Sequence, residues 1–277
     1  MSISAPRSWL GDLDGLLRGK RTMGEALRQG IIDAPLSRFI PFAIGLGACY
    51  GFFMGWFAYA GRTAEAWQQL VASTVKLPAL FLLTLFVTFP SLYVFNALVG
   101  CRLGFLAVLR LLVAAIVVNL AVAASLGPIL AFFTLSTTSY AFMVILNVVL
   151  LAIGGGVGLG FLLKTLRRIE AEAMEEARSE AFIRVETLKE EAAARGDTPP
   201  AAEIRAAAEI PTTAVGSANV IFRIWVVIYA LVGAQMAWLL RPFIGNPDMA
   251  FTWFRGRELG GNFFASVLHH MGRLFGV

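Results

Sequence analysis

The stretch from Leu111 to Leu163 reads LLVAAIVVNLAVAASLGPILAFFTLSTTSYAFMVILNVVLLAIGGGVGLGFLL, and it contains no Asp, Glu, Lys, Arg or His. A helix needs roughly 20 apolar residues to cross about 30 Å of hydrocarbon, so the stretch is long enough for two crossings. The short segment from Leu135 to Ser139 separates them. We therefore predict two transmembrane helices, approximately Leu111–Phe133 and Tyr140–Leu163.

The same search on either side finds three more apolar segments, approximately Phe39–Ala60, Leu77–Val99 and Ile224–Leu240. The last of these is short unless it starts near Val220. Of the 277 residues 58% are hydrophobic and 15% are charged, a composition outside the range of a soluble domain of this length. The predicted fold class is therefore all-α, a polytopic transmembrane bundle of about five spans.

The polar segments divide the chain further. We expect a cytoplasmic amphipathic arm at 1–37, four transmembrane helices within 38–163, a cytoplasmic charged helix and linker at 164–217, a fifth transmembrane helix at 218–240 and an exterior interfacial tail at 241–277. Charges run through the arm and leave no continuous apolar core for a cleavable signal. Its leucines recur at three- and four-residue intervals, which predicts a helix lying either on an anionic membrane surface or on the protein's own cytoplasmic side.

The distribution of Lys and Arg predicts the orientation, because short segments rich in these residues are retained in the cytoplasm. With the N-terminus inside, 17 of the 23 Lys and Arg residues are cytoplasmic. The exterior connections then carry only Arg62 and Lys76. Five spans place the C-terminal tail outside, although its four arginines run against the rule, and a re-entrant fifth segment would reverse that end.

The segment from Lys164 to Arg195 is rich in Ala, Glu, Leu and Arg and free of Gly and Pro, which favours a continuous helix. Glu191 and Arg195 have the favourable acid-first spacing of four residues. Phe182, Val185 and Leu188 belong to an intermittent apolar stripe. We therefore expect the helix at 164–195 to contact a protein partner.

Membrane-embedded proton relays and ion sites use Asp, Glu, His or Lys, and the five predicted spans contain none of these in their interiors. Their polar residues are mainly amides and hydroxyls. The candidate site residues are the four embedded amides, Asn96, Asn119, Asn147 and Gln235. Such side chains form hydrogen bonds between helices, or they line a polar path for a small solute. No catalytic residue, cofactor site or metal site is predicted.

Gly47, Gly51 and Gly55 recur every four residues in the first span, and such a ridge lets helix backbones approach closely. It predicts close packing within the bundle or a homo-oligomer through these glycines. In the tail, His269 and His270 are adjacent, so they lack the four-residue spacing of a helical zinc site.

The segments KLPALFLLTLFVTFPSLYVFNALVG (Lys76–Gly100) and AQMAWLLRPFIGNPDMAFTWFR (Ala234–Arg255) resemble parts of uncharacterised bacterial polytopic membrane proteins. In its plan of a cytoplasmic arm, five spans and a brief exterior end, the chain also resembles the Yip1-like family of membrane-trafficking and membrane-shaping proteins. The charged insertion between spans four and five departs from that family. The resemblance implies a bacterial inner-membrane location and transfers no site residue.

We expect a non-enzymatic membrane scaffold or adaptor that uses the helix at 164–195 as its partner surface. The competing expectation is a passive channel or small-solute facilitator whose path is lined by Asn96, Asn119 and Asn147. An enzyme acting on lipid at the exterior tail would need Arg257, Glu258 and His269 to cluster. The expected partners are the lipid bilayer and a protein, with no nucleic acid, because the basic residues form no compact patch with interleaved aromatic residues.

Overall fold

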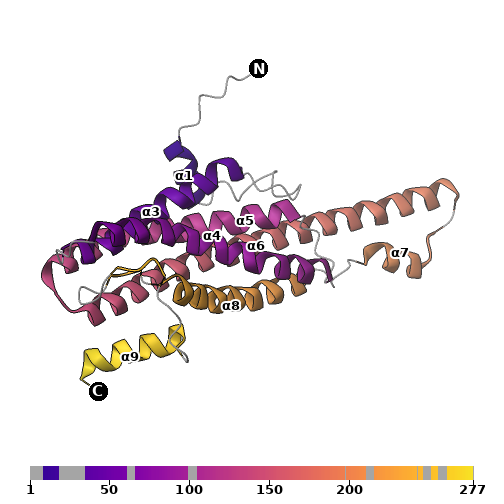
Figure 1. Ribbon diagram of the computed structural model, residues 1–277. Coiled ribbons are helices and arrows are strands. Elements are labelled where there is room, and N and C mark those ends of the chain that lie inside the picture. Colours follow the sequence, from indigo (N-terminus) through magenta and orange to yellow (C-terminus); the bar gives the residue numbers. More distant parts are fainter. Residues whose placement is uncertain are drawn as a thin grey trace.

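The chain is all-α over the residues described by the computed structural model, which are 9–18, 35–60, 66–98, 105–196, 198–209, 215–241, 243–245, 251–254 and 261–276 (Figure 1). Eight helices lie in these ranges: α1 Trp9–Leu17, α3 Leu36–Ala60, α4 Ala66–Leu98, α5 Phe105–Ser136, α6 Tyr140–Ala194, α7 Ala201–Ala208, α8 Val215–Leu240 and α9 Phe263–Phe275. Five of them, α3, α4, α5, α6 and α8, are long and apolar enough to cross a membrane. The predicted fold class is confirmed.

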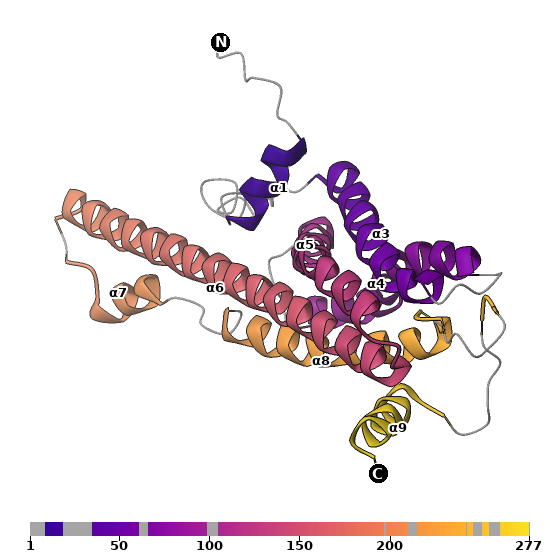
Figure 2. The same cartoon turned by 90° about the vertical axis from the view of Figure 1, so that its left-hand side faces the viewer.

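The five long helices form one bundle in which α3 packs between α4 and α5, and α5 packs against α6. Helix α8 packs on α4 and also contacts α6. Helix α5 is the most enclosed of the five, because its inward face supplies a run of buried side chains that includes Leu111, Val117 and Leu120. We call the end of the bundle that carries α1, and beyond which α6 extends, the arm end, and the opposite end, beside α9, the tail end (Figures 1 and 2).

The glycine ridge of α3 faces α4 of the same chain. A methyl group added at Gly47 would lie 3.0 Å from the Pro78 side chain, and one added at Gly51 would lie 2.5 Å from the Ser73 carbonyl oxygen. Gly55 is equally close to the backbone of Leu70. The ridge is therefore filled by α4 of the same chain and its glycines are buried, which is the first of the two predicted arrangements. A homo-oligomer contact through Gly47, Gly51 and Gly55 stays a prediction.

Helices α4 and α8 start well before their predicted positions. Helix α4 starts at Ala66 and not at Leu77, and it carries Pro78 and Pro90 in its interior. A proline removes one backbone hydrogen bond and usually ends a helix, but membrane helices tolerate it where neighbouring helices pack closely. Pro78 lies against Gly47 at such a contact. Helix α8 starts at Val215, and its candidate membrane span is Arg223–Leu240.

Helix α8 lies at the edge of the bundle. It is held by Trp225, whose indole nitrogen donates to the Thr88 carbonyl at 3.1 Å, and by Tyr229, whose hydroxyl donates to the Phe81 carbonyl at 3.3 Å. Trp225 is buried, but most apolar side chains of the helix, including Leu231, are at least partly exposed. Such a surface fits contact with lipid, which solvates apolar side chains as well as a protein core does.

Helix α6 continues without a break from the bundle into the charged segment and projects beyond the other long helices (Figures 1 and 2). The predicted pair of Glu191 and Arg195 forms at 3.9 Å. Helix α7 packs back against α6, and Ala181 and Ala192 on α6 are buried.

Both ends of the bundle carry a short helix. At the arm end, Leu16 of α1 is completely buried and belongs to the same apolar cluster as Phe39 and Leu166. Helix α1 thus packs on the protein itself, as one of the two predicted arrangements requires. At the tail end, Asn262 caps α9 by accepting a hydrogen bond from the Ala265 amide, and the helix packs against α6 and α8.

Candidate functional site

Asn147 takes part in a buried hydrogen bond between two helices. The hydroxyl of Tyr50 on α3 donates to Asn147 Oδ1 on α6 at 2.9 Å. Tyr50 is fully buried and Asn147 is 8% exposed. Because both groups would cost free energy if left unpaired in an apolar interior, the bond fixes α3 against α6.

Asn119 lies where α5 and α6 pack closely. A methyl group at Gly154 would lie 2.7 Å from Asn119 Oδ1, and one at Gly158 would lie 2.9 Å from Asn119 Cβ. The Oδ1 atom is buried, and it has no hydrogen-bond partner among the described residues. Gly154 and Gly158, near the end of the fourth span, therefore leave the space that the Asn119 side chain occupies.

The other two predicted residues do not join them. Gln235 is exposed on the edge helix α8. The side chain of Asn96 lies outside the described part of the chain. Of the three described amides, one is bonded to Tyr50, one is packed against glycines and one is exposed, so they are not assembled around one described polar path.

A polar seam that the sequence analysis did not predict joins α4 to the chain after α8. Gln69 Nε2 donates to the Phe243 carbonyl at 2.9 Å, and the Ser73 hydroxyl donates to the same carbonyl. The ammonium group of Lys76 donates to the Trp253 carbonyl. Its Nζ also lies 5.1 Å from the centre of the Phe254 ring, within the range of a cation–π contact.

The placement of Lys76 differs from the predicted one. We expected it in a connection between helices, but it is 4% exposed and lies inside α4, within the candidate span Ala66–Val94. A signal was present in the sequence: Gln69, Ser73 and Lys76 recur at helical spacing before the apolar run begins. The donor groups of the seam all point at backbone carbonyls of the chain that follows α8. This arrangement suits a structural role, which is to hold that part of the chain against α4.

The two tail histidines have structural contacts. His270 Nδ1 lies 2.7 Å from the Ser266 carbonyl, and its ring centre lies 5.5 Å from that of Tyr140. The Tyr140 hydroxyl donates to the Ile244 carbonyl at 3.3 Å. In the described ranges no three His, Cys, Asp or Glu side chains form a group suited to a metal. Arg257 and Glu258, which an enzyme at the tail would require, lie outside those ranges.

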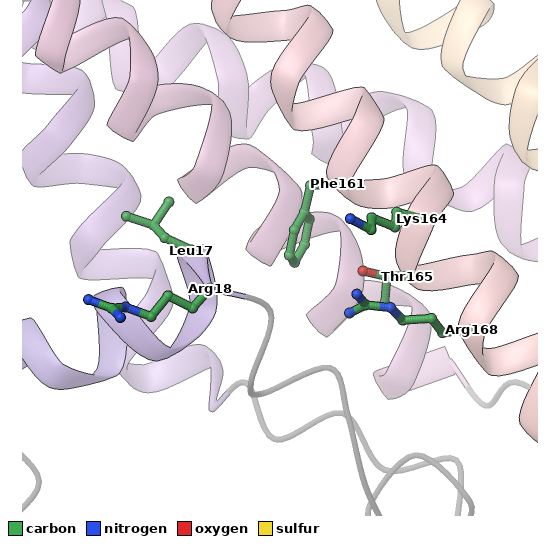
Figure 3. A pocket seen from close by; sticks show the side chains of 6 residues that line it. All are labelled: Leu17, Arg18, Phe161, Lys164, Thr165 and Arg168. Atoms are coloured by element: carbon green, nitrogen blue, oxygen red, sulfur yellow. The ribbon is translucent and has the colours of Figure 1, made fainter.

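At the arm end, α1 and α6 line a pocket of about 90 Å³. Its lining consists of three cationic, two apolar and one hydroxyl side chain, which are Arg18, Lys164, Arg168, Leu17, Phe161 and Thr165. Figure 3 shows Lys164 and Arg168 reaching from α6 towards α1 on either side of Thr165. The guanidinium of Arg18 is directed away from them and pairs with Asp14 at 2.7 Å.

No protein-family model, curated protein or solved structure matches this sequence. The family resemblances suggested by the two sequence segments and by the topology are not supported by any match. The chain is a helical protein with five candidate membrane spans.

Proposed function

We propose that this protein is a non-enzymatic membrane scaffold or adaptor, and that the part of α6 beyond the bundle is its contact surface for a cytoplasmic protein partner. The observation that carries the proposal is a pair of large apolar side chains on the projecting helix. Phe182 is 68% exposed and Ile183 is 59% exposed. Both lie in a segment whose other exposed residues are mostly charged or polar, beyond the apolar run Tyr140–Leu163 that the sequence predicts to span the membrane.

The face of α6 that packs against α7 is already covered within the chain. Ala181, Val185, Leu188 and Ala192 follow one another at three- and four-residue intervals, and the two alanines are buried. Phe182 and Ile183 lie off this face. The apolar stripe predicted from the sequence is thus divided, with Val185 and Leu188 partly covered and Phe182 free to contact another protein.

The continuity of α6 also supports the proposal. The helix runs from Tyr140 to Ala194 without interruption. A partner bound to its far half would therefore be joined to the bundle through one continuous helix. Ion pairs at three- and four-residue spacing, such as Lys189 with Glu186 at 3.6 Å, reinforce the far half. The expected partner presents apolar side chains, because these are what Phe182 and Ile183 would bury.

The test combines site-specific photocrosslinking with substitution. A photoreactive benzoylphenylalanine placed at position 182 of the full-length protein in native membranes should give one discrete adduct. The double variant Phe182→Ser/Ile183→Ser should lose that partner on co-purification. The matched control, Phe264→Ser/Leu268→Ser, removes two exposed apolar side chains from α9 and should retain it. A diffuse set of adducts, or equal recovery with both variants, would reject the proposal.

The alternative function, a passive channel or facilitator, is favoured by one observation, the unpartnered Oδ1 atom of Asn119. A carbonyl oxygen at depth can coordinate a passing polar solute. Purified protein in sealed vesicles would then conduct a small polar solute down its gradient, and Asn119→Ala would slow the flux without adding volume beside Gly154. Vesicles that stay as tight as protein-free vesicles for water, glycerol and monovalent ions would exclude this function.

A further inference from the structure

The pocket between α1 and α6 lies where α6 changes from apolar to charged. Lys164 is the first charged residue of α6, and it follows the uncharged run that ends at Leu163. Arg167 and Arg168 come one turn later, and the first acidic residue of the helix is Glu170. A basic belt confined to this one turn marks the depth at which lipid headgroups would meet the helix.

The pocket has a net positive charge. Asp14 neutralises Arg18 through a direct ion pair. None of the ion pairs among the described residues involves Lys164 or Arg168, and Glu172, the acid one turn beyond Arg168, is not among the residues that line the pocket. Thr165 is 1% exposed and lies between the two cations, where its hydroxyl adds a hydrogen-bond donor (Figure 3).

Its volume limits what it can hold. About 90 Å³ is several times the ~10–15 Å³ that one water needs. It is well below the roughly 300–1,000 Å³ of a pocket for a drug-sized ligand. A single phosphate group fits this range, and ammonium and guanidinium groups are the side chains that bind phosphate oxygens best.

An apolar track continues from the pocket along α6. Ile153 and Val157 precede Phe161 at four-residue intervals, and Lys164 and Arg168 follow it at intervals of three and four, so all five lie on one face of the helix. Ile153 is 49% exposed and Val157 is 46% exposed. This face of α6 is therefore cationic at the pocket and apolar along the track that leads away from it. An anionic headgroup joined to an acyl chain would use both parts, whereas free phosphate would use only the cationic part.

We propose that this pocket binds the phosphate of an anionic glycerophospholipid. Lys164, Arg168 and Thr165 hold the headgroup, while Phe161 and the track at Ile153 and Val157 contact an acyl chain. Bound lipid also joins α1 to α6, because Leu17 and Arg18 form the opposite wall. The site is independent of the proposed partner surface at Phe182, so either can fail without the other.

The test measures lipid retention by native mass spectrometry on the full-length protein in neutral detergent. Phosphatidylglycerol should be retained in preference to phosphatidylcholine of the same chain length. In the variant Lys164→Gln/Arg168→Gln the retained phosphatidylglycerol should fall about tenfold or more, since each cation near an anionic headgroup contributes to binding. The control Arg184→Gln/Lys189→Gln removes the same charge from the exposed far half of α6 and should bind as the wild type does.

Three results would overturn the proposal. Equal retention of the two lipids would remove the requirement for an anionic headgroup. Equal loss of phosphatidylglycerol in both double variants would mean that retention depends on the overall positive charge of α6 and not on this pocket. Full displacement of phosphatidylglycerol by millimolar inorganic phosphate would assign the pocket to the free ion. An unchanged melting temperature of Lys164→Gln/Arg168→Gln without added lipid shows that the variant is folded.

Discussion

Tyr50 and Asn147 form the buried side-chain hydrogen bond that is most open to a direct test. Replacing Tyr50 by Phe keeps the ring but leaves Asn147 Oδ1 without its donor. We expect the free energy of unfolding to fall by about 0.6–2 kcal/mol, the range for hydrogen bonds between membrane helices. The measurement is reversible unfolding in mixed micelles, and the control is Tyr59→Phe, which removes the same hydroxyl from an exposed tyrosine of α3.

A double-variant cycle completes this test. If the bond carries the effect, Tyr50→Phe and Asn147→Leu together should cost less than the sum of the two single changes. Strict additivity, or an equal effect of Tyr59→Phe, would mean that the hydroxyl and the amide do not interact.

Gly51 gives a second prediction at the residue scale. A methyl group there would lie 2.5 Å from the Ser73 carbonyl oxygen, so Gly51→Ala forces α3 and α4 apart. We expect a loss of about 1–3 kcal/mol in the free energy of unfolding, as for overpacked cores. Gly45→Ala, where nothing lies within 4 Å of the added carbon, should be neutral or slightly stabilising.

The same pair of variants separates two roles of the ridge. If the ridge packs within one chain, Gly51→Ala changes stability and leaves the oligomeric state in detergent as it was. A variant that lost self-association at unchanged stability would support the homo-oligomer interpretation of Gly47, Gly51 and Gly55.

At the residue scale the sequence indicated which residues are important, but it did not indicate which residues they contact. Asn147 and Gly51 stand out because an amide and a glycine in an apolar span need an explanation. Their partners are separated from them in the chain, as Tyr50 is by 97 residues from Asn147, and one sequence carries no information about which helix faces which. The exposure of Gln235 was missed for the same reason, since α8 packs on α4 through Trp225 and Tyr229 on another part of its surface.

At the scale of elements, apolar length predicted the number of long helices, whereas the charge of Lys76 misplaced one start. The search for uncharged apolar stretches began the second span at Leu77, directly after that lysine. In the folded bundle Pro78 rests on Gly47, and the helix continues back to Ala66 ahead of it, where the Thr74 hydroxyl donates to the Leu70 carbonyl. That continuation draws Lys76 into the helix and creates the seam with the tail.

Lys76 provides the prediction for this element. Lys76→Met keeps the length and apolar stem of the side chain but removes the donor to the Trp253 carbonyl and the cation beside the Phe254 ring. Hydrogen exchange in peptides that cover residues 251–254 should become about tenfold faster, which corresponds to the loss of roughly 1–2 kcal/mol of local stabilisation.

The matched control is Lys189→Met, at an exposed site on the far half of α6. It should leave exchange at 251–254 unchanged. Equal exchange in wild type and Lys76→Met would show that Gln69 and Ser73 hold the tail without help from the lysine.

The whole molecule has two unlike ends. The arm end has the buried Leu16, the basic pocket and the projecting half of α6, whereas the tail end has the Lys76 seam and the capped helix α9. Five candidate spans separate the first from the second. Because an odd number of crossings puts the two chain ends on opposite sides, Ser179 on α6 and Ala265 on α9 should face different compartments.

Cysteine labelling tests this arrangement in cells that express the full-length protein. In a Cys49→Ser/Cys101→Ser background, Ala265→Cys should react with a membrane-impermeant maleimide in intact cells, whereas Ser179→Cys should react only after permeabilisation. Both positions are exposed, so access to the reagent is decided by the membrane and not by packing. If neither cysteine reacts in intact cells, α8 turns back before crossing, the four arginines of the tail obey the charge rule, and the molecule has four spans. If both react in intact cells, α8 again turns back, but the predicted orientation of the bundle is inverted.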